Sequence, residues 1–156
     1  NLARFDGVRY GLHVDGEDLY GDYVKTRGAG FGREAKRRII LGTYVLSHGY
    51  YDAYYAKACR IRAAIRREFE DAFTTVDAIA IPTTPSTAFM LGENTSDPLQ
   101  MYLEDIFTVP ANIAELPAIS IPSGKTASGL PIGFQLIAPY CCESVLFSIG
   151  KDINVG

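Results

Sequence analysis

The sequence contains no tryptophan, two histidines and three cysteines, and these shortages limit the chemistry available to the chain. The odd number of cysteines leaves one thiol unpaired in any disulfide scheme, and the adjacent Cys141 and Cys142 have poor geometry for a bridge. No cysteine or histidine spacing is typical of a zinc site. We therefore expect reduced thiols, a cytoplasmic location and no metal bound by this chain.

The chain also lacks a long hydrophobic run and an excess of positive charge. No apolar stretch approaches the ~20 residues that cross a bilayer, so we expect no membrane partner. The formal net charge of −3 argues against a basic surface for nucleic acid over the whole domain. A hydrophobic share of 47% with 21% charged residues is instead typical of a globular domain.

The N-terminal region shows neither a targeting segment nor helical periodicity. Residues 1–4 contain no initiator methionine and are too polar for a signal peptide, so we expect the chain to begin inside a longer protein. Residues 1–30 are rich in glycine, aspartate and tyrosine, and this composition predicts a loop with short extended pieces.

Periodic apolar positions predict two helices after this loop. The first covers residues 32–47, and Gly49 follows it at the position of a left-handed cap. The second covers residues 52–73, where apolar side chains recur at steps of three and four. Four arginines lie mostly off that apolar stripe: Arg60, Arg62, Arg66 and Arg67. We interpret them as a solvated helix face neutralised by nearby carboxylates, rather than as an RNA site.

Short apolar runs predict strands in the second half of the chain. Residues 78–81 and 118–121 are such runs, each followed by a proline. Residues 132–138 form a third run, and the short glycine-containing turn before it predicts a hairpin with 118–121. Between these runs, residues 97–106 predict a helix that ends before Pro110. Helices followed by strands that are apolar on both faces indicate an α/β fold.

Histidine-based catalysis has little support in this sequence. His13 falls in the predicted loop, and His48 falls at a predicted helix end. A Ser-His-Asp or Cys-His catalytic set would need one of them, and neither lies in a motif. We interpret both histidines as structural.

Two other side chains could together recognise a small zwitterion. Arg38 lies beside the apolar residues 39–41, and a fixed guanidinium can bind a carboxylate through two hydrogen bonds. Asp105 lies at the end of the later predicted helix, where its carboxylate could accept hydrogen bonds from an ammonium group. The alternatives are an i,i+4 salt bridge between Arg38 and Glu34, which spacing alone favours, and a capping role for Asp105.

Seven sequence blocks follow one another along the chain and cover nearly all of it. They are residues 1–11, 30–43, 49–55, 97–105, 107–112, 116–122 and 129–137. In this order and with these gaps, the chain resembles the amidase signature family. Its strand–turn–strand ending is shared by amidases in general. The Arg-Phe-Asp-Gly and Lys-Arg-Arg-Ile segments point more narrowly to the glutamine-hydrolysing A subunits of tRNA-dependent amidotransferases.

The resemblance implies an α/β fold in which a mixed β-sheet is sandwiched between helices. Residues 1–156 would be the C-terminal portion of a single amidase domain. It also implies a Ser–Ser–Lys catalytic set, carried by a segment expected before Asn1, so no catalytic residue is assigned to this chain. At the matching positions, Arg38 is expected to bind the α-carboxylate of glutamine, and Asp105 is expected to bind its α-amino group.

The resemblance further implies a reaction and a set of partners. Such enzymes hydrolyse glutamine and pass the ammonia to a B subunit. The B subunit uses ATP and Mg²⁺ to activate glutamate on misacylated tRNA(Gln), or aspartate on tRNA(Asn), and a small C subunit helps hold A and B together. This chain itself is expected to need no cofactor and to meet tRNA only through the B subunit.

Two competing interpretations stay open from the sequence. The first is another amidase of the same family that acts on a small amide. An apolar pocket for such a substrate would leave an Arg–Asp pair unused, and unpaired buried charge is costly. The second is a non-catalytic interaction domain, since tyrosine is enriched at interfaces. Its support is a group of tyrosines in the second predicted helix and just before it: Tyr50, Tyr51, Tyr54 and Tyr55.

Overall fold

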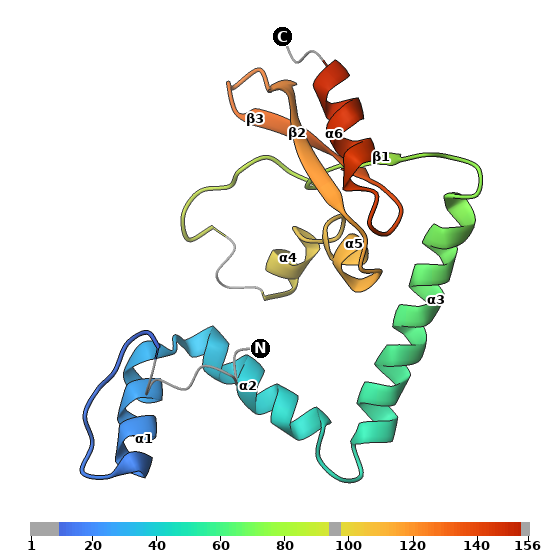
Figure 1. Cartoon of the computed structure of the whole chain (residues 1–156). Coiled ribbons are helices and arrows are strands. Elements are labelled where there is room, and N and C mark those ends of the chain that lie inside the picture. Colours follow the sequence, from blue (N-terminus) through green and yellow to red (C-terminus); the bar gives the residue numbers. More distant parts are fainter. Residues whose placement is uncertain (1–9, 94–97, 154–156) are drawn as a thin grey trace. The chain divides into compact units, whose positions relative to one another are not determined.

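The computed structural model describes residues 10–93 and 98–153, which divide into two compact units. The first unit is Asn1–Ala58 and the second is Cys59–Gly156. In the described residues, the first unit is helical, whereas the second combines helices with a sheet (Figure 1). The predicted α/β class is confirmed.

The first unit contains α1 (Leu19–Gly30), α2 (Arg33–Val45) and a π-helix, η2 (Tyr51–Ala56). The prediction of a loop up to residue 30 is wrong, because α1 occupies the end of that segment. Three glycines lower the helix propensity of α1, and no apolar stripe marks it. Its first turn is stabilised by Asp18, whose side chain accepts a hydrogen bond from the backbone N–H of Gly21 at 2.7 Å.

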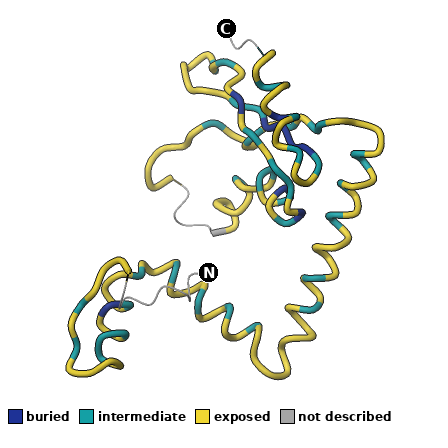
Figure 2. The backbone as a smooth tube through the Cα atoms, in the orientation of Figure 1, coloured by how far each residue is buried: buried dark blue, intermediate teal, exposed yellow. Residues whose placement is uncertain are grey.

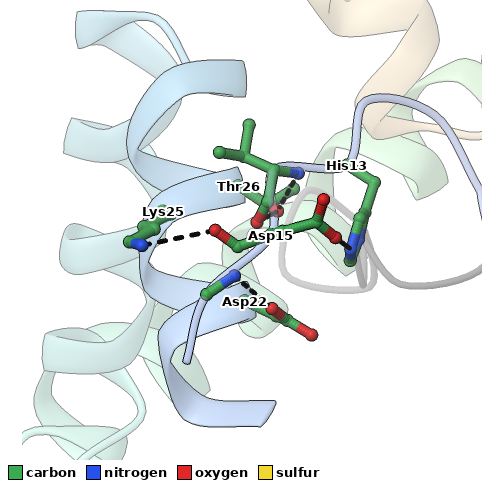
Figure 3. A network of polar contacts seen from close by, with 7 residues as sticks. His13, Asp15, Asp22, Lys25 and Thr26 are labelled. Carbon is green, nitrogen blue, oxygen red and sulfur yellow. Dashed lines mark hydrogen bonds and ion pairs between the residues drawn. The ribbon is translucent and has the colours of Figure 1, made fainter. Parts of the chain in front are cut away.

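The loop before α1 folds back onto this helix through side-chain hydrogen bonds (Figure 3). Thr26 is fully buried; its Oγ1 accepts a hydrogen bond from the Val14 N–H at 2.9 Å and donates one to the Val14 carbonyl at 3.2 Å. The N–H of Gly16 donates to the Asp22 carboxylate. Helix α1 has no apolar stripe, so these hydrogen bonds, rather than apolar packing, hold the preceding loop against it.

Gly16 provides a sharp test of this docked loop. A Cβ at position 16 would lie 2.4 Å from the backbone nitrogen of Asp22, so Gly16→Ala must displace the loop or the helix. We expect a loss of about 1–3 kcal/mol in the free energy of unfolding, measured by urea denaturation followed by circular dichroism. Gly28→Ala is the control, because a Cβ there meets no atom within 4 Å, and alanine favours a helix. Equal stability of the two variants would contradict the docking.

The two helices predicted from periodicity are confirmed. The helix expected over residues 32–47 is α2, and Gly49 has the expected left-handed conformation with φ of 87°. The helix expected over residues 52–73 is η2 followed directly by α3 (Lys57–Ala72). The π-helical start was not predicted, since a widened turn changes the apolar steps by only one residue.

The second unit is built on an antiparallel sheet of β1 (Ile79–Pro82), β2 (Ala118–Lys125) and β3 (Pro131–Ile137). The strand order is β1-β3-β2, so β3 is central, and the predicted hairpin of β2 with β3 is confirmed. In the described part of this unit, the sheet is accompanied by most of α3 and by α4 (Pro98–Leu103), α5 (Val109–Ile113) and α6 (Glu143–Asp152).

Helix α6 covers one face of this sheet. Its Leu146 belongs to a buried apolar cluster with Ile121, Leu136 and Ala138, and Figure 2 shows buried residues gathered in this region. Successive side chains of a strand point to opposite faces, so Gln135 faces away from α6. Gln135 is only 5% exposed, and its side chain contacts the segment that precedes α5. The central strand therefore has helical segments on both of its faces.

Two arginines of α3, Arg62 and Arg66, are paired with carboxylates. Arg66 Nε donates to Glu70 Oε1 at 3.0 Å, which confirms the expected neutralisation within the helix. Arg66 Nη1 also donates to Glu115 Oε2 at 2.8 Å, and Arg62 lies 3.6 Å from the same carboxylate. Glu115 is 49 residues beyond Arg66, so helical spacing gave no sign of this contact.

Membrane-spanning helices and metal clusters are both missing from the described ranges. Over residues 10–93 and 98–153, no helix is long and apolar enough to cross a membrane. Within the same ranges, no three His, Cys, Asp or Glu side chains are placed to hold one metal ion. The three cysteines are free thiols.

Candidate substrate-binding site

Arg38 lies on α2 and makes the ion pair that its spacing predicts. Its Nε donates to Glu34 Oε1 at 2.9 Å, and Arg37 Nη2 donates to the same oxygen at 3.0 Å. The hydrogen bond from Arg37, followed by that from Arg38, holds the pKa of Glu34 below its ordinary value. The Arg38 side chain is 61% exposed, and the contact uses Nε alone. Its two terminal nitrogens make no hydrogen bond with other described residues, so they can still bind a carboxylate.

Asp105 lies in the turn between α4 and α5, not at the end of a helix. The predicted helix ends at Leu103, and Pro110 lies in the first turn of α5 rather than after a helix. The Asp105 carbonyl accepts hydrogen bonds from the N–H groups of Thr108 at 3.1 Å and Val109 at 3.0 Å. The main-chain carbonyl of Asp105 thus makes the capping contacts that the sequence suggested for its side chain.

The carboxylate of Asp105 is exposed and makes no hydrogen bond with any described residue. Its neighbour Glu104 differs, because Glu104 Oε2 accepts a hydrogen bond from Ser86 Oγ at 2.8 Å. The turn is also held by Gln135 of β3, whose Nε2 donates to the Phe107 carbonyl at 2.9 Å. A fixed turn with one unused carboxylate is suited to binding a cation.

Gln135 was missed in the reasoning from sequence. The only available signal was a single amide in the otherwise apolar strand segment 132–138. A buried amide must be hydrogen-bonded, and its partner is 28 residues away in sequence. The repeat of apolar residues along a strand or helix does not predict contacts between residues so far apart in sequence.

Arg38 belongs to the first unit and Asp105 to the second. The geometry of each residue therefore stands by itself, and their joint binding of one ligand stays a prediction. His13 contacts Asp15, with 3.1 Å between Nε2 and Oδ1, in the loop that docks on α1 (Figure 3). His48 is exposed in the turn after α2. The structural role expected for both histidines stays a prediction.

Comparison with known proteins identifies the family. The family model described as Amidase matches residues 1–147, which is nearly the whole chain. The chain belongs to the amidase family. The resemblance seen in the sequence is therefore confirmed, and the three-stranded sheet with its helices is a part of the amidase fold.

Among members of the amidase family, the chain is similar to the A subunit of glutamyl-tRNA(Gln) amidotransferase from Parvibaculum lavamentivorans. The two are 60% identical over 154 residues, which are 99% of this chain and 31% of that protein. The chain thus spans about a third of the length of the curated relatives it matches.

Two solved structures of the amidase family share the fold. The crystal structure of the glutamyl-tRNA(Gln) amidotransferase A subunit from Thermotoga maritima is 47% identical, with a TM-score of 0.64 over 83% of this chain and 28% of that chain. A structure described as an amidase has a TM-score of 0.62 at 24% identity, over 85% of this chain and 30% of that one. At that identity, the second likeness shows the fold alone.

Proposed function

We propose that this chain is part of a glutaminase subunit of a tRNA-dependent amidotransferase, and that it supplies the site for the head group of glutamine. The observation that carries the proposal is the 60% identity to the A subunit of a glutamyl-tRNA(Gln) amidotransferase over 99% of the chain. Within the site, Arg38 binds the α-carboxylate and Asp105 binds the α-amino group. Within the described residues, the terminal nitrogens of Arg38 and the carboxylate of Asp105 have no hydrogen-bond partner, which supports these roles.

In the proposed reaction, the full-length subunit releases ammonia from glutamine in the cytoplasm. The ammonia is used by a B subunit, which consumes ATP with Mg²⁺ to convert Glu-tRNA(Gln) to Gln-tRNA(Gln). A C subunit joins the two larger subunits. The chain makes no direct contact with tRNA, in keeping with its net charge of −3.

The ammonia assay tests the proposal directly. The full-length subunit, within its complex, is expected to release ammonia from glutamine and to leave an arylacetamide or a fatty amide almost untouched. The 156-residue chain alone is expected to release none above a buffer blank, because no residue in it is assigned to the Ser–Ser–Lys set. Preference of the full-length subunit for the apolar amide would support the competing amidase instead. Ammonia from the isolated chain would show that the catalytic set is here.

A further inference from the structure

The turn that carries Asp105 is held from the sheet. Gln135, in the middle of β3, extends its side chain to Phe107 and donates from Nε2 to the carbonyl oxygen at 2.9 Å. Phe107 lies two residues after Asp105 in the same turn. The hydrogen bond therefore fixes the main chain just beyond the carboxylate.

The position of Gln135 makes it a rigid anchor. In the central strand it is paired in register with Ile81 on one side and Ser120 on the other. Its side chain is 5% exposed, and a buried amide is tolerated only when its hydrogen bonds are made. An apolar residue could fill this place in the sheet, but it could not hold the Phe107 carbonyl.

Among the described residues, no other contact of the turn uses the Asp105 carboxylate. Ser86 holds the preceding side chain, that of Glu104, and the N–H groups of Thr108 and Val109 bind the Asp105 carbonyl. All of these contacts involve neighbouring groups or the main chain. Gln135 is the one buried side chain of the sheet among them.

We propose that Gln135 is a positioning residue for substrate recognition: by holding the Phe107 carbonyl, it sets the Asp105 carboxylate against the ammonium group of glutamine. The inference rests on the proposed function and adds a residue that touches no substrate. Loss of the hydrogen bond lets the turn shift, which weakens binding of substrates that carry the α-amino group. Substrates without this group make no use of Asp105 and are unaffected.

The test compares two substrates in the full-length subunit within its complex. Glutaric acid monoamide is glutamine without its α-amino group. Gln135→Met has a similar length and no N–H donor. We expect it to raise the KM for glutamine about tenfold, with kcat nearly unchanged and no change in the KM for the monoamide. In an Asp105→Asn background, Gln135→Met is expected to add no further increase.

Ser120→Ala is the matched control. Ser120 is the register partner of Gln135 on the same face of the sheet, and its hydroxyl lies 2.9 Å from that of Thr83 rather than near the turn. The control removes a hydrogen bond of the sheet and is expected to leave the preference between the two substrates unchanged. Gln135→Leu gives a second comparison if Gln135→Met does not fold. Its apolar side chain can fill the same place in the sheet and has no donor for the Phe107 carbonyl, so the same selective rise is expected.

The outcomes separate this inference from the proposed function. An equal rise in KM for both substrates, or no rise for either, would overturn the positioning role. If Asp105→Asn raises the KM for glutamine and Gln135→Met does not, the inference fails and the proposed site stands. If Asp105→Asn has no effect on that KM, both fail together.

Discussion

Replacing Arg38 with alanine in the full-length subunit is expected to lower kcat/KM for glutamine about 30-fold or more, which corresponds to ~2 kcal/mol for a charge-assisted contact. The reason is the guanidinium itself. Its ion pair with Glu34 uses Nε, so the two terminal nitrogens can grip the α-carboxylate of the substrate. The measurement is ammonia release at several glutamine concentrations, with folding checked by a thermal melt.

Arg37 offers a matched control for Arg38. It also donates to Glu34 Oε1, at 3.0 Å, from the adjacent position on α2. If the role of Arg38 were only to neutralise Glu34, Arg37→Ala and Arg38→Ala would have similar effects. We expect Arg37→Ala to retain nearly full activity. If Arg38→Ala changes neither the kinetics nor the melt, Arg38 does not bind the substrate, and its ion pair with Glu34 is its only assigned contact among the described residues.

A substrate without the carboxylate sharpens this result. In 4-aminobutanamide the α-carboxylate of glutamine is replaced by hydrogen. Its hydrolysis by the wild-type subunit is expected to be slow, and Arg38→Ala should slow it no further. An equal loss on both substrates would point to damage to the fold rather than to a lost contact.

Asp105→Asn is expected to raise the KM for glutamine about 30-fold, because a neutral amide replaces the anion that we propose binds the substrate ammonium group, and hydrogen bonds to charged groups contribute about 1.5–3 kcal/mol. The change should fall on KM rather than on kcat, since the ammonium is bound equally in the ground state and the transition state. Glutaric acid monoamide, which lacks this group, should be hydrolysed as well by the variant as by the wild type.

Glu104→Gln is the control for Asp105. It removes a negative charge from the adjacent position, and its amide oxygen can still accept the hydrogen bond from Ser86. If the rise in KM came only from the loss of one negative charge in the turn, Glu104→Gln and Asp105→Asn would both weaken glutamine binding. We expect only Asp105→Asn to do so. Equal KM values for Asp105→Asn and the wild type would remove Asp105 from the site.

Local features of the fold were predictable because they depend on near neighbours. The strand–turn–strand segment that ends in β3 and the amphipathic stripe of α3 each follow from a repeat within a few residues. Helix α1 was not predicted because its stability depends on a residue outside its own segment. Its glycines lower helix propensity, and the side chain that anchors it, Thr26, meets the loop 12 residues earlier.

The candidate site was only partly accessible to reasoning from residues. Spacing placed Arg38 next to Glu34, and the structure confirms that ion pair. The role of Arg38 toward glutamine came from the resemblance, and it stays a prediction. For Asp105, the sequence suggested a cap, whereas the structure assigns the cap to the main-chain carbonyl, and the carboxylate has no partner among residues 10–93 and 98–153.

The sequence by itself determined the α/β class, the hairpin and the amidase resemblance, because periodicity, turn chemistry and residue order are all written along the chain. Only the tertiary structure decided which distant groups meet: Gln135 with the Phe107 carbonyl, Arg66 with Glu115, and Thr26 with Val14. The physical reason is that a hydrogen bond or an ion pair acts over about 3 Å. Two residues far apart in sequence come that close only after the strands, helices and turns between them have packed.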